Sequence, residues 1–205
     1  MLGHLRPYVG SLKKMLAWPY IKLGFSPTSV GLFGVFLALI AALSMRLGFF
    51  TFAFCLAFVA MSTDMADGEV ARLTATQSPQ GNYLDALGDR LREGILLLGL
   101  LPLAPNLVSL ALLATFLTSY AKARCSLVLM MDNSDWPGFG DHADRGVLVL
   151  VAYLLAPNQL WPILLLVTTT CFCFCFRIRN ALSRIEKAKE EELLPYLRTS
   201  AKYHR

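Results

Sequence analysis

Four long stretches of this chain contain no charged residue, and they constrain the fold more than any other feature. They cover residues 23–45, 47–63, 94–121 and 146–176. The hydrocarbon core of a membrane is about 30 Å thick, so a helix of about 20 apolar residues can cross it. Hydrophobic residues make up 56% of the chain and the mean hydropathy is +0.53, which is too apolar for an ordinary soluble domain. The sequence therefore predicts a protein embedded in a membrane.

Prolines divide the two longest uncharged stretches. Pro102 and Pro105 interrupt the third stretch, and Pro157 and Pro162 interrupt the fourth. Proline lacks a backbone N–H and ends a helix, so a new helix should start after each interruption. One of the resulting helices begins before its uncharged stretch and includes the charges near Asp85. We therefore predict an all-α membrane protein with six transmembrane helices.

The two ends of the chain differ from this core. Residues 1–25 mix Leu, Trp and Tyr with lysines, which is typical of an interfacial amphipathic helix lying on the membrane surface. Ser26 followed by Pro27 predicts the start of the first span, because proline at an early helix position loses no hydrogen bond. Residues 181–205 alternate Lys or Arg with Glu and are expected to form a cytoplasmic C-terminal helix or tail. The six-helix transmembrane domain then covers residues 26–180.

Positive charges are distributed unequally across the predicted spans. With six spans, all Lys and Arg residues except Arg46 fall on one side of the membrane. Positively charged loops remain in the cytoplasm, so we expect an integral protein of a prokaryotic cytoplasmic membrane with its active site facing the cytoplasm. The net charge of +5 does not indicate nucleic-acid binding, because no basic patch with interleaved aromatic residues accompanies it. The lipid bilayer and phosphorylated substrates are the expected partners.

Four aspartates at helical spacing form the most informative cluster. Asp64 and Asp67 are three residues apart at the end of the second span, and Asp85 and Asp89 are four apart at the start of the third. Each pair therefore shares a helix face. The loop at residues 73–80 is short enough to make the two helices antiparallel neighbours. Four aspartates facing lipid would cost on the order of 10 kcal/mol, so they should converge on one polar centre that binds cations.

The ligand chemistry of this centre favours hard cations. Carboxylate oxygens suit Mg²⁺, Mn²⁺ or Ca²⁺ better than Zn²⁺, and four of them suit two ions that share an aspartate. Alternatively, the aspartates only form salt bridges with Arg72, Arg90 and Arg92. Those pairs leave excess negative charge and do not explain the small residues Gly68 and Ala71, which let a phosphorylated ligand approach the helix backbone. Arg72 can bind phosphate oxygens through two N–H groups.

This segment resembles the signature of the CDP-alcohol phosphotransferases, D-x2-D-G-x2-A-R-x8-G-x3-D-x3-D, at every specified position. The matching residues are Asp64, Asp67, Gly68, Ala71, Arg72, Gly81, Asp85 and Asp89. The resemblance implies an N-terminal interfacial helix, six spans, a cytoplasm-facing site and a homodimer. It also implies an enzyme that transfers a phosphatidyl or archaetidyl group from CDP-diacylglycerol or CDP-archaeol to an alcohol and releases CMP.

The same resemblance assigns roles to the residues of the signature. Two divalent ions, Mg²⁺ or Mn²⁺, are expected on Asp64, Asp67, Asp85 and Asp89. The general base that removes the proton from the acceptor hydroxyl is expected to be Asp89. The CDP portion of the donor is expected on Asp67, Gly68, Ala71, Arg72 and Gly81. Family members often carry a threonine four residues after the proline of the first span, whereas this chain has Gly31 there.

A second cluster, at the end of the fourth predicted span, concerns the acceptor. Ser119 and Lys122 share a helix face and, with Arg145, can ring one phosphate. Lys122 and Arg124 are also explained as ordinary cations at the cytoplasmic end of a span. The run S-Y-x-K-A-R at residues 119–124 resembles the phosphatidylinositol-phosphate synthase branch, in which such residues form the pocket for the phosphate of inositol phosphate. By that resemblance the acceptor pocket consists of Ser119, Lys122, Arg124 and Arg145.

The loop that precedes Arg145 departs from this branch. It usually reads E-R-x-E-R, whereas residues 141–145 read D-H-A-D-R, so that His142 replaces a cation. We expect His142 to be a loop residue satisfied by solvent or a neighbouring acid, and not a catalytic base. A further pocket arginine near the end of the last span is either Arg177 or Arg179.

Three functions are consistent with these features. The leading hypothesis is transfer of the lipid phosphoryl group to inositol phosphate, a small phosphorylated polyol. The nearest rival keeps the chemistry and changes the acceptor to glycerol phosphate, serine or another small alcohol. The third is a small cation or metabolite transporter whose intramembrane aspartates bind a permeating cation. This last hypothesis leaves Gly68, Ala71 and Arg72 unexplained.

Overall fold

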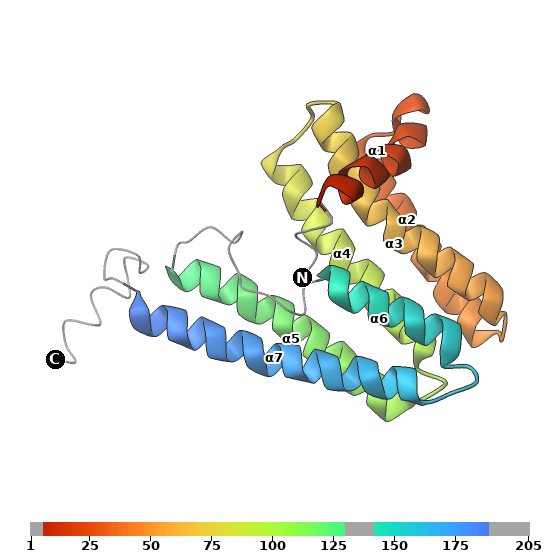
Figure 1. Cartoon of the computed structure of the whole chain (residues 1–205), viewed down its shortest axis with the longest axis vertical. Coiled ribbons are helices and arrows are strands. Elements are labelled where there is room, and N and C mark those ends of the chain that lie inside the picture. Colours follow the sequence, from red (N-terminus) through yellow and green to blue (C-terminus); the bar gives the residue numbers. More distant parts are fainter. Residues whose placement is uncertain (1–5, 130–141, 189–205) are drawn as a thin grey trace.

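The computed structural model describes residues 6–129 and 142–188, which form helices joined by short turns (Figure 1). The helices are α1 (Arg6–Lys22), α2 (Pro27–Arg46), α3 (Phe50–Leu73), α4 (Pro79–Leu100), α5 (Pro105–Leu129), α6 (His142–Leu155) and α7 (Trp161–Lys187). No strand occurs within these residues. The prediction of an all-α protein is confirmed.

Serine and proline together define the start of two helices near the aspartates. Ser26 caps α2, where its Oγ accepts a hydrogen bond from the backbone N–H of Ser29 at 3.2 Å, and Pro27 follows as the first helical residue. Ser78 caps α4 in the same way, with its Oγ 3.0 Å from the backbone nitrogen of Gly81. A side-chain oxygen at this position satisfies one of the free N–H groups of the first turn. The predicted helix start at Ser26 and Pro27 is therefore confirmed.

The helices form two packed groups, which α6 and a direct contact between α4 and α5 connect. α2 packs against both α3 and α4, whereas α5 pairs with α7, and α6 contacts α3, α4 and α7. Figure 1 shows α5 and α7 running side by side, and α1 lying across the α2–α3 pair. Small residues bring the first group close together: a Cβ on Gly34 of α2 would collide with Thr63 Oγ1, and one on Gly99 of α4 would lie 2.8 Å from the Cα of Ala42. Such close backbone approach is typical of membrane helices.

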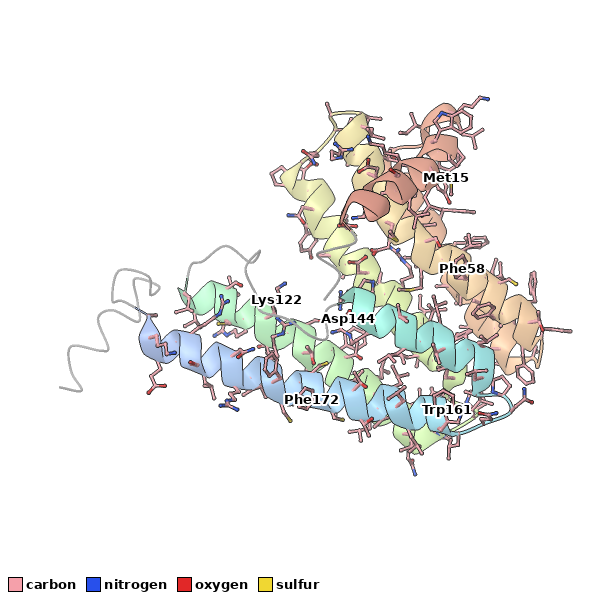
Figure 2. All side chains as sticks on the ribbon, in the orientation of Figure 1. Met15, Phe58, Lys122, Asp144, Trp161 and Phe172 are labelled. Carbon is pink, nitrogen blue, oxygen red and sulfur yellow. The ribbon has the colours of Figure 1, made fainter. Side chains whose placement is uncertain are left out.

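Large apolar side chains cover much of the outer surface. Phe58 of α3 and Phe172 of α7 point outward (Figure 2), and 55% and 60% of their surfaces are exposed. Among the described helices, α2, α3 and α7 are long and apolar enough to cross a membrane. α4 contains five charged residues after Tyr83, and α6 has 14 residues, fewer than the roughly 20 that a span requires. The count of six spans therefore stays a prediction.

Helices α1 and α7 lie next to the two domain boundaries that the sequence predicts. α1 covers residues 6–22 of the predicted interfacial segment, and Lys22 Nζ lies 5.0 Å from the centre of the Trp18 ring. α7 continues to Lys187, past the expected end of the transmembrane domain at residue 180. The remainder of the predicted tail, residues 189–205, lies outside the described residues. The interfacial, amphipathic role of α1 stays a prediction.

Candidate active site

Four aspartate side chains of α3 and α4 converge on one centre. Carboxylate oxygens of Asp64, Asp67 and Asp85 all lie within 4.8 Å of one another, and a second such group joins Asp64, Asp89 and a ring nitrogen of His142. The four aspartates therefore converge as their spacing predicts. They form two groups of possible ligands, and Asp64 belongs to both.

Helix packing explains how two pairs of aspartates reach one point. Asp64 and Asp67 lie on α3, one turn apart, and the chain then turns back through residues 74–78 into α4. α2 packs along both helices and fixes their relative position. Ala75 in the turn has a φ of +54°, an uncommon conformation for a residue with a Cβ. The short turn thereby brings Asp85, in the second turn of α4, opposite Asp67.

Arg92 is the nearest cation to these carboxylates, and its side chain is fully buried. Its guanidinium nitrogens lie 3.6 Å from Asp64 Oδ1, 3.7 Å from Asp67 Oδ2 and 3.5 Å from Asp89 Oδ1. It also donates to Thr63 Oγ1 at 3.4 Å. Arg92 therefore forms the salt bridges with the aspartates that the alternative interpretation predicts. One guanidinium among four carboxylates still leaves excess negative charge.

The other two arginines that could pair with the aspartates, Arg72 and Arg90, form salt bridges with glutamates. Arg72 binds Glu69 through two contacts, from Nε at 2.9 Å and from Nη2 at 2.6 Å. Arg90 donates to Glu93 Oε2 at 3.0 Å and is 4.0 Å from Asp89 Oδ2. Neither glutamate was predicted as a site residue. Charged residues within an apolar helix are rare and functional in membranes, and this rule is the signal that points to Glu93.

A cavity of about 870 Å³ opens beside the aspartates, between α2, α3 and α4. The signature residues that line it are Asp67, Gly68, Ala71, Gly81 and Asp85. A Cβ on Gly68 would meet no atom within 4 Å, so the backbone of α3 is open to a ligand there. Arg72, by contrast, lies outside the lining of the cavity. Five of the eight signature residues therefore surround a space large enough for a small ligand.

The cavity has one apolar wall and one polar end. Leucines 84, 87 and 91 of α4 and Leu32 and Val35 of α2 form the apolar wall. The polar end includes Gln77 of the turn before α4 and Gln80 in the first turn of α4. Gly31 also lines it, and a Cβ there would lie 3.2 Å from Asp67 Oδ2. A threonine at this position would therefore stand directly against Asp67. Glycine leaves that part of the cavity wider.

On the other side of Asp89, a buried ion-pair network surrounds Glu93. Its carboxylate accepts hydrogen bonds from Arg145 Nε at 2.7 Å and Nη2 at 3.1 Å, and lies 3.1 Å from His142 Nδ1. Arg90 completes the network, because its Nη1 donates to both Glu93 and, at 2.9 Å, Ser119 Oγ. Glu93 thus links α4 to α6, and Arg90 links α4 to α5.

The residues predicted for the acceptor pocket divide into two groups. Ser119 and Arg145 belong to the Glu93 network, and Arg145 is buried. Lys122 lies on α5 (Figure 2) and is half-buried, whereas Arg124 is exposed. On α7, Arg177 is buried and Arg179 exposed.

His142 differs in part from its prediction. It is the first residue of α6 and not a loop residue. The expectation that a neighbouring acid satisfies it is confirmed by the contact between its Nδ1 and Glu93. The preceding residue, Asp141, lies outside the described residues.

A family model of CDP-alcohol phosphatidyltransferases matches residues 26–175 of the chain. The chain belongs to this family. The matched region runs from the cap of α2 into α7 and so contains all four aspartates. Members of the family are transferases of membranes, and the chain is accordingly an integral membrane transferase.

Individual relatives of this transferase include archaetidylinositol and phosphatidylinositol phosphate synthases. The archaetidylinositol phosphate synthase of Pyrococcus horikoshii is 26% identical over 157 residues, which cover 75% of this chain and 82% of that protein. The structure of Mycobacterium tuberculosis phosphatidylinositol phosphate synthase with bound CDP-DAG superposes with a TM-score of 0.70 and 22% identity, over 83% of this chain and 94% of that one. The structure of the same M. tuberculosis protein with manganese and citrate also superposes with a TM-score of 0.70, over 83% of this chain and 89% of that one. These structures share the fold of the transferase.

Transferases of this family depend on metal ions, and the residues present fit that requirement. Both groups of ligand atoms around Asp64 have a span of at most 4.8 Å, and their ligands are mainly carboxylate oxygens, which hard divalent cations prefer. The side chain of Asp89 is 17% exposed. A divalent ion can therefore be held here by two or three carboxylates at once.

Proposed function

We propose that this transferase moves a phosphatidyl or archaetidyl group from a CDP-lipid to a hydroxyl of inositol phosphate and releases CMP. One observation carries the proposal: five of the eight residues of the CDP-alcohol signature line a single cavity, and Asp89 of the same signature lies 3.9 Å from His142 of the buried Glu93–Arg145 network. The names of the similar proteins, which include a structure with CDP-DAG bound and an archaetidylinositol phosphate synthase, support the same donor and acceptor.

The donor is proposed to bind in the cavity between α2, α3 and α4. Gly68, Ala71 and Gly81 let the CDP portion approach the helix backbones, and Asp67 lies between the nucleotide and the metal centre. The leucines of the apolar wall suit the start of the lipid chains. Arg72 can reach the diphosphate when its contact with Glu69 opens, because its side chain is 54% exposed.

Two divalent cations, Mg²⁺ or Mn²⁺, are proposed to be held by Asp64, Asp67, Asp85 and Asp89. When bound, such ions neutralise diphosphate charge and stabilise the attacking and leaving oxygens of an in-line displacement. Asp64 is the proposed shared ligand, since it belongs to both groups of ligand atoms. Arg92 beside these carboxylates supplies a fixed positive charge to the same centre.

Asp89 is proposed to act as the general base. It lies between the other aspartates and the Glu93 network, with Arg90 at 4.0 Å and His142 at 3.9 Å. From there its carboxylate can take the proton from the acceptor hydroxyl as the hydroxyl oxygen bonds to the lipid-side phosphorus. The bond between that phosphorus and the CMP oxygen breaks in the same displacement, and CMP leaves.

The phosphate of the acceptor is proposed to bind among the cations near Glu93. Ser119, Lys122, Arg124 and Arg145 remain the proposed contacts. Of the two α7 candidates, Arg177 is favoured because it is buried, whereas Arg179 is exposed. Arginine binds phosphate oxygens through paired N–H groups, which favours a phosphorylated acceptor over serine or an uncharged alcohol.

The chain is proposed to cross a prokaryotic cytoplasmic membrane six times, as a homodimer with its active site on the cytoplasmic side. Apolar side chains on the outer surface support membrane contact. The charges of the sequence support the orientation, because Arg46 lies at the opposite end of α2 from Ser26 and the aspartate side of the bundle. α1 would lie in the membrane interface with its lysines toward the lipid headgroups.

A CMP-release assay tests the reaction and the acceptor. The purified protein is incubated with CDP-diacylglycerol or CDP-archaeol, Mg²⁺ or Mn²⁺, and one of inositol phosphate, glycerol phosphate, inositol or serine. We expect CMP release with inositol phosphate. Release with glycerol phosphate alone would refute the acceptor and keep the chemistry, and no release with any alcohol would refute the enzyme.

A further inference from the structure

The geometry points to His142 as a metal ligand: we propose that its Nε2 binds the divalent ion held by Asp64 and Asp89, so that one of the two ions has a nitrogen ligand. This inference rests on the proposed two-metal function and adds a residue that the signature does not contain. His142 comes from α6, outside the two helices that carry the aspartates.

The first argument is the position of the imidazole. The ring nitrogen of His142 and the oxygens of Asp64 and Asp89 all lie within 4.8 Å of one another, and Nε2 is 3.9 Å from Asp89 Oδ1. Ligands at about 2.1 Å from one octahedral ion are separated by roughly 3 to 4 Å. The distance between Nε2 and Asp89 Oδ1 falls within this range, and the Asp64 oxygen lies within 4.8 Å of both atoms.

The second argument is the orientation of the ring. Nδ1 is 3.1 Å from Glu93 Oε2, so it can donate its proton to that carboxylate and leave the lone pair of the neutral ring on Nε2. Glu93 is held in turn by Arg145 at 2.7 Å. Metal-binding histidines nearly always donate the other ring N–H to a carboxylate, carbonyl or water, which fixes the ring. Glu93 is the carboxylate that would fix the ring of His142 in this way.

The third argument is that Nε2 is buried without a hydrogen-bond partner among the described residues. Buried polar atoms normally have a partner, and an exception requires an explanation. Only 12% of the His142 side chain is exposed, so bulk water does not readily supply one. An ion between His142, Asp64 and Asp89 would satisfy this atom and both carboxylates.

Nitrogen ligation would change which metal the site prefers. Imidazole binds transition metals such as iron, nickel and zinc, whereas Mg²⁺ prefers oxygen ligands. Of the two proposed ions only Mn²⁺ is a transition metal, so it should accept the nitrogen more readily than Mg²⁺. The other group, Asp64 with Asp67 and Asp85, contains only oxygens. The two positions should therefore differ, with the Asp89–His142 position favouring Mn²⁺ and the Asp67–Asp85 position accepting either ion.

Electron spin-echo envelope modulation on the Mn²⁺-loaded full-length protein tests the ligand directly. We expect modulation from a directly bonded ¹⁴N in the unmodified protein and its loss in His142→Asn. Asparagine can keep an amide N–H toward Glu93 while it lacks the nitrogen at the place of Nε2. The other two histidines of the chain are His4 and His204, and replacing both by glutamine should leave the ¹⁴N signal unchanged.

Metal affinities give a second, independent measurement. In His142→Asn we expect the affinity for one of two Mn²⁺ ions to fall by roughly ten-fold or more, since even the loss of an outer partner of a ligand costs 10- to 100-fold. The affinity for Mg²⁺ should change much less. An equal loss for both ions would contradict a nitrogen ligand.

The outcomes separate this inference from the proposed function. Mn²⁺ bound to the unmodified protein without ¹⁴N modulation would overturn the role of His142 and leave the four-aspartate site intact. No Mn²⁺ binding at all would overturn both. Because the decisive spectrum comes from the unmodified protein, a variant that fails to fold does not affect the result.

Discussion

The two sides of Asp89 are built differently. On the donor side, five signature residues line a cavity of about 870 Å³ and the helix backbone itself is open at Gly68. On the acceptor side, Glu93 and Arg145 are buried and tied together by hydrogen bonds. The donor side therefore depends on empty space, and the acceptor side on fixed charges. A substitution should act through volume on one side and through lost ion pairs on the other.

The largest expected effect comes from the residue between the two sides. Asp89→Asn keeps the volume of the side chain and removes both the proposed base and a metal ligand. A general base contributes about 100- to 10,000-fold to the rate, so CMP release should fall at least about a thousand-fold. The elution volume of the detergent-solubilised protein should not change. Glu186→Gln, at the exposed end of α7, serves as the control, and activity near the normal level in Asp89→Asn would refute the base.

Two glutamates allow the sides to be compared by the same substitution. Glu93→Gln weakens the buried pair with Arg145 and should raise the KM for inositol phosphate by about 10- to 100-fold, or about 1.4–2.8 kcal/mol, with little change in the donor KM. Glu69→Gln acts on Arg72, which is 54% exposed. Glu69 is only 8% exposed, but the arginine end of the pair is open to water. Solvent-exposed pairs contribute about 0–1 kcal/mol, so the donor KM should change less than about five-fold. A larger rise of the donor KM in Glu69→Gln than of the inositol phosphate KM in Glu93→Gln would contradict the proposed difference between the two sides.

The smallest effect tests the space on the donor side. Gly68→Ala adds one methyl group where no atom lies within 4 Å, and alanine is the better helix former by about 1 kcal/mol. Thermal stability should therefore be kept or raised, while the donor KM rises by about ten-fold, or about 1.4 kcal/mol. Gly10→Ala on α1 is the matched control, because its added methyl is equally unopposed but outside the cavity. An unchanged donor KM in Gly68→Ala would show that CDP does not contact this backbone.

The donor side could be predicted from the sequence because its determinants are local. Ser26 and Pro27 mark the start of α2, and the prolines at 102 and 157 lie in the breaks that separate α4 from α5 and α6 from α7. The spacing of Asp64 and Asp67 fixes a helix face without knowledge of any partner helix. A short turn then suffices to place α4 opposite α3.

The acceptor side could not be predicted in the same way, because its contacts are distant in the chain. Glu93 and His142 are 49 residues apart, and Glu93 and Arg145 are 52 apart. Their contact depends on where α6 packs, which periodicity does not specify. Arg92 was foreseen only as a generic salt-bridge partner, since its contact with three aspartates depends on the direction of one long side chain. Burial and orientation decide these interactions.

The buried guanidinium of Arg92 also has a consequence for how the protein matures. It provides a permanent positive charge within 3.7 Å of three carboxylates, and arginine does not lose its proton in proteins. The helices can therefore close around the aspartates during membrane insertion, before any ion arrives. Folding and metal supply become separate events, unlike in small zinc domains that unfold without their ion. Chelator-treated protein should accordingly still unfold cooperatively on heating, and a loss of that transition would show that the two events are coupled.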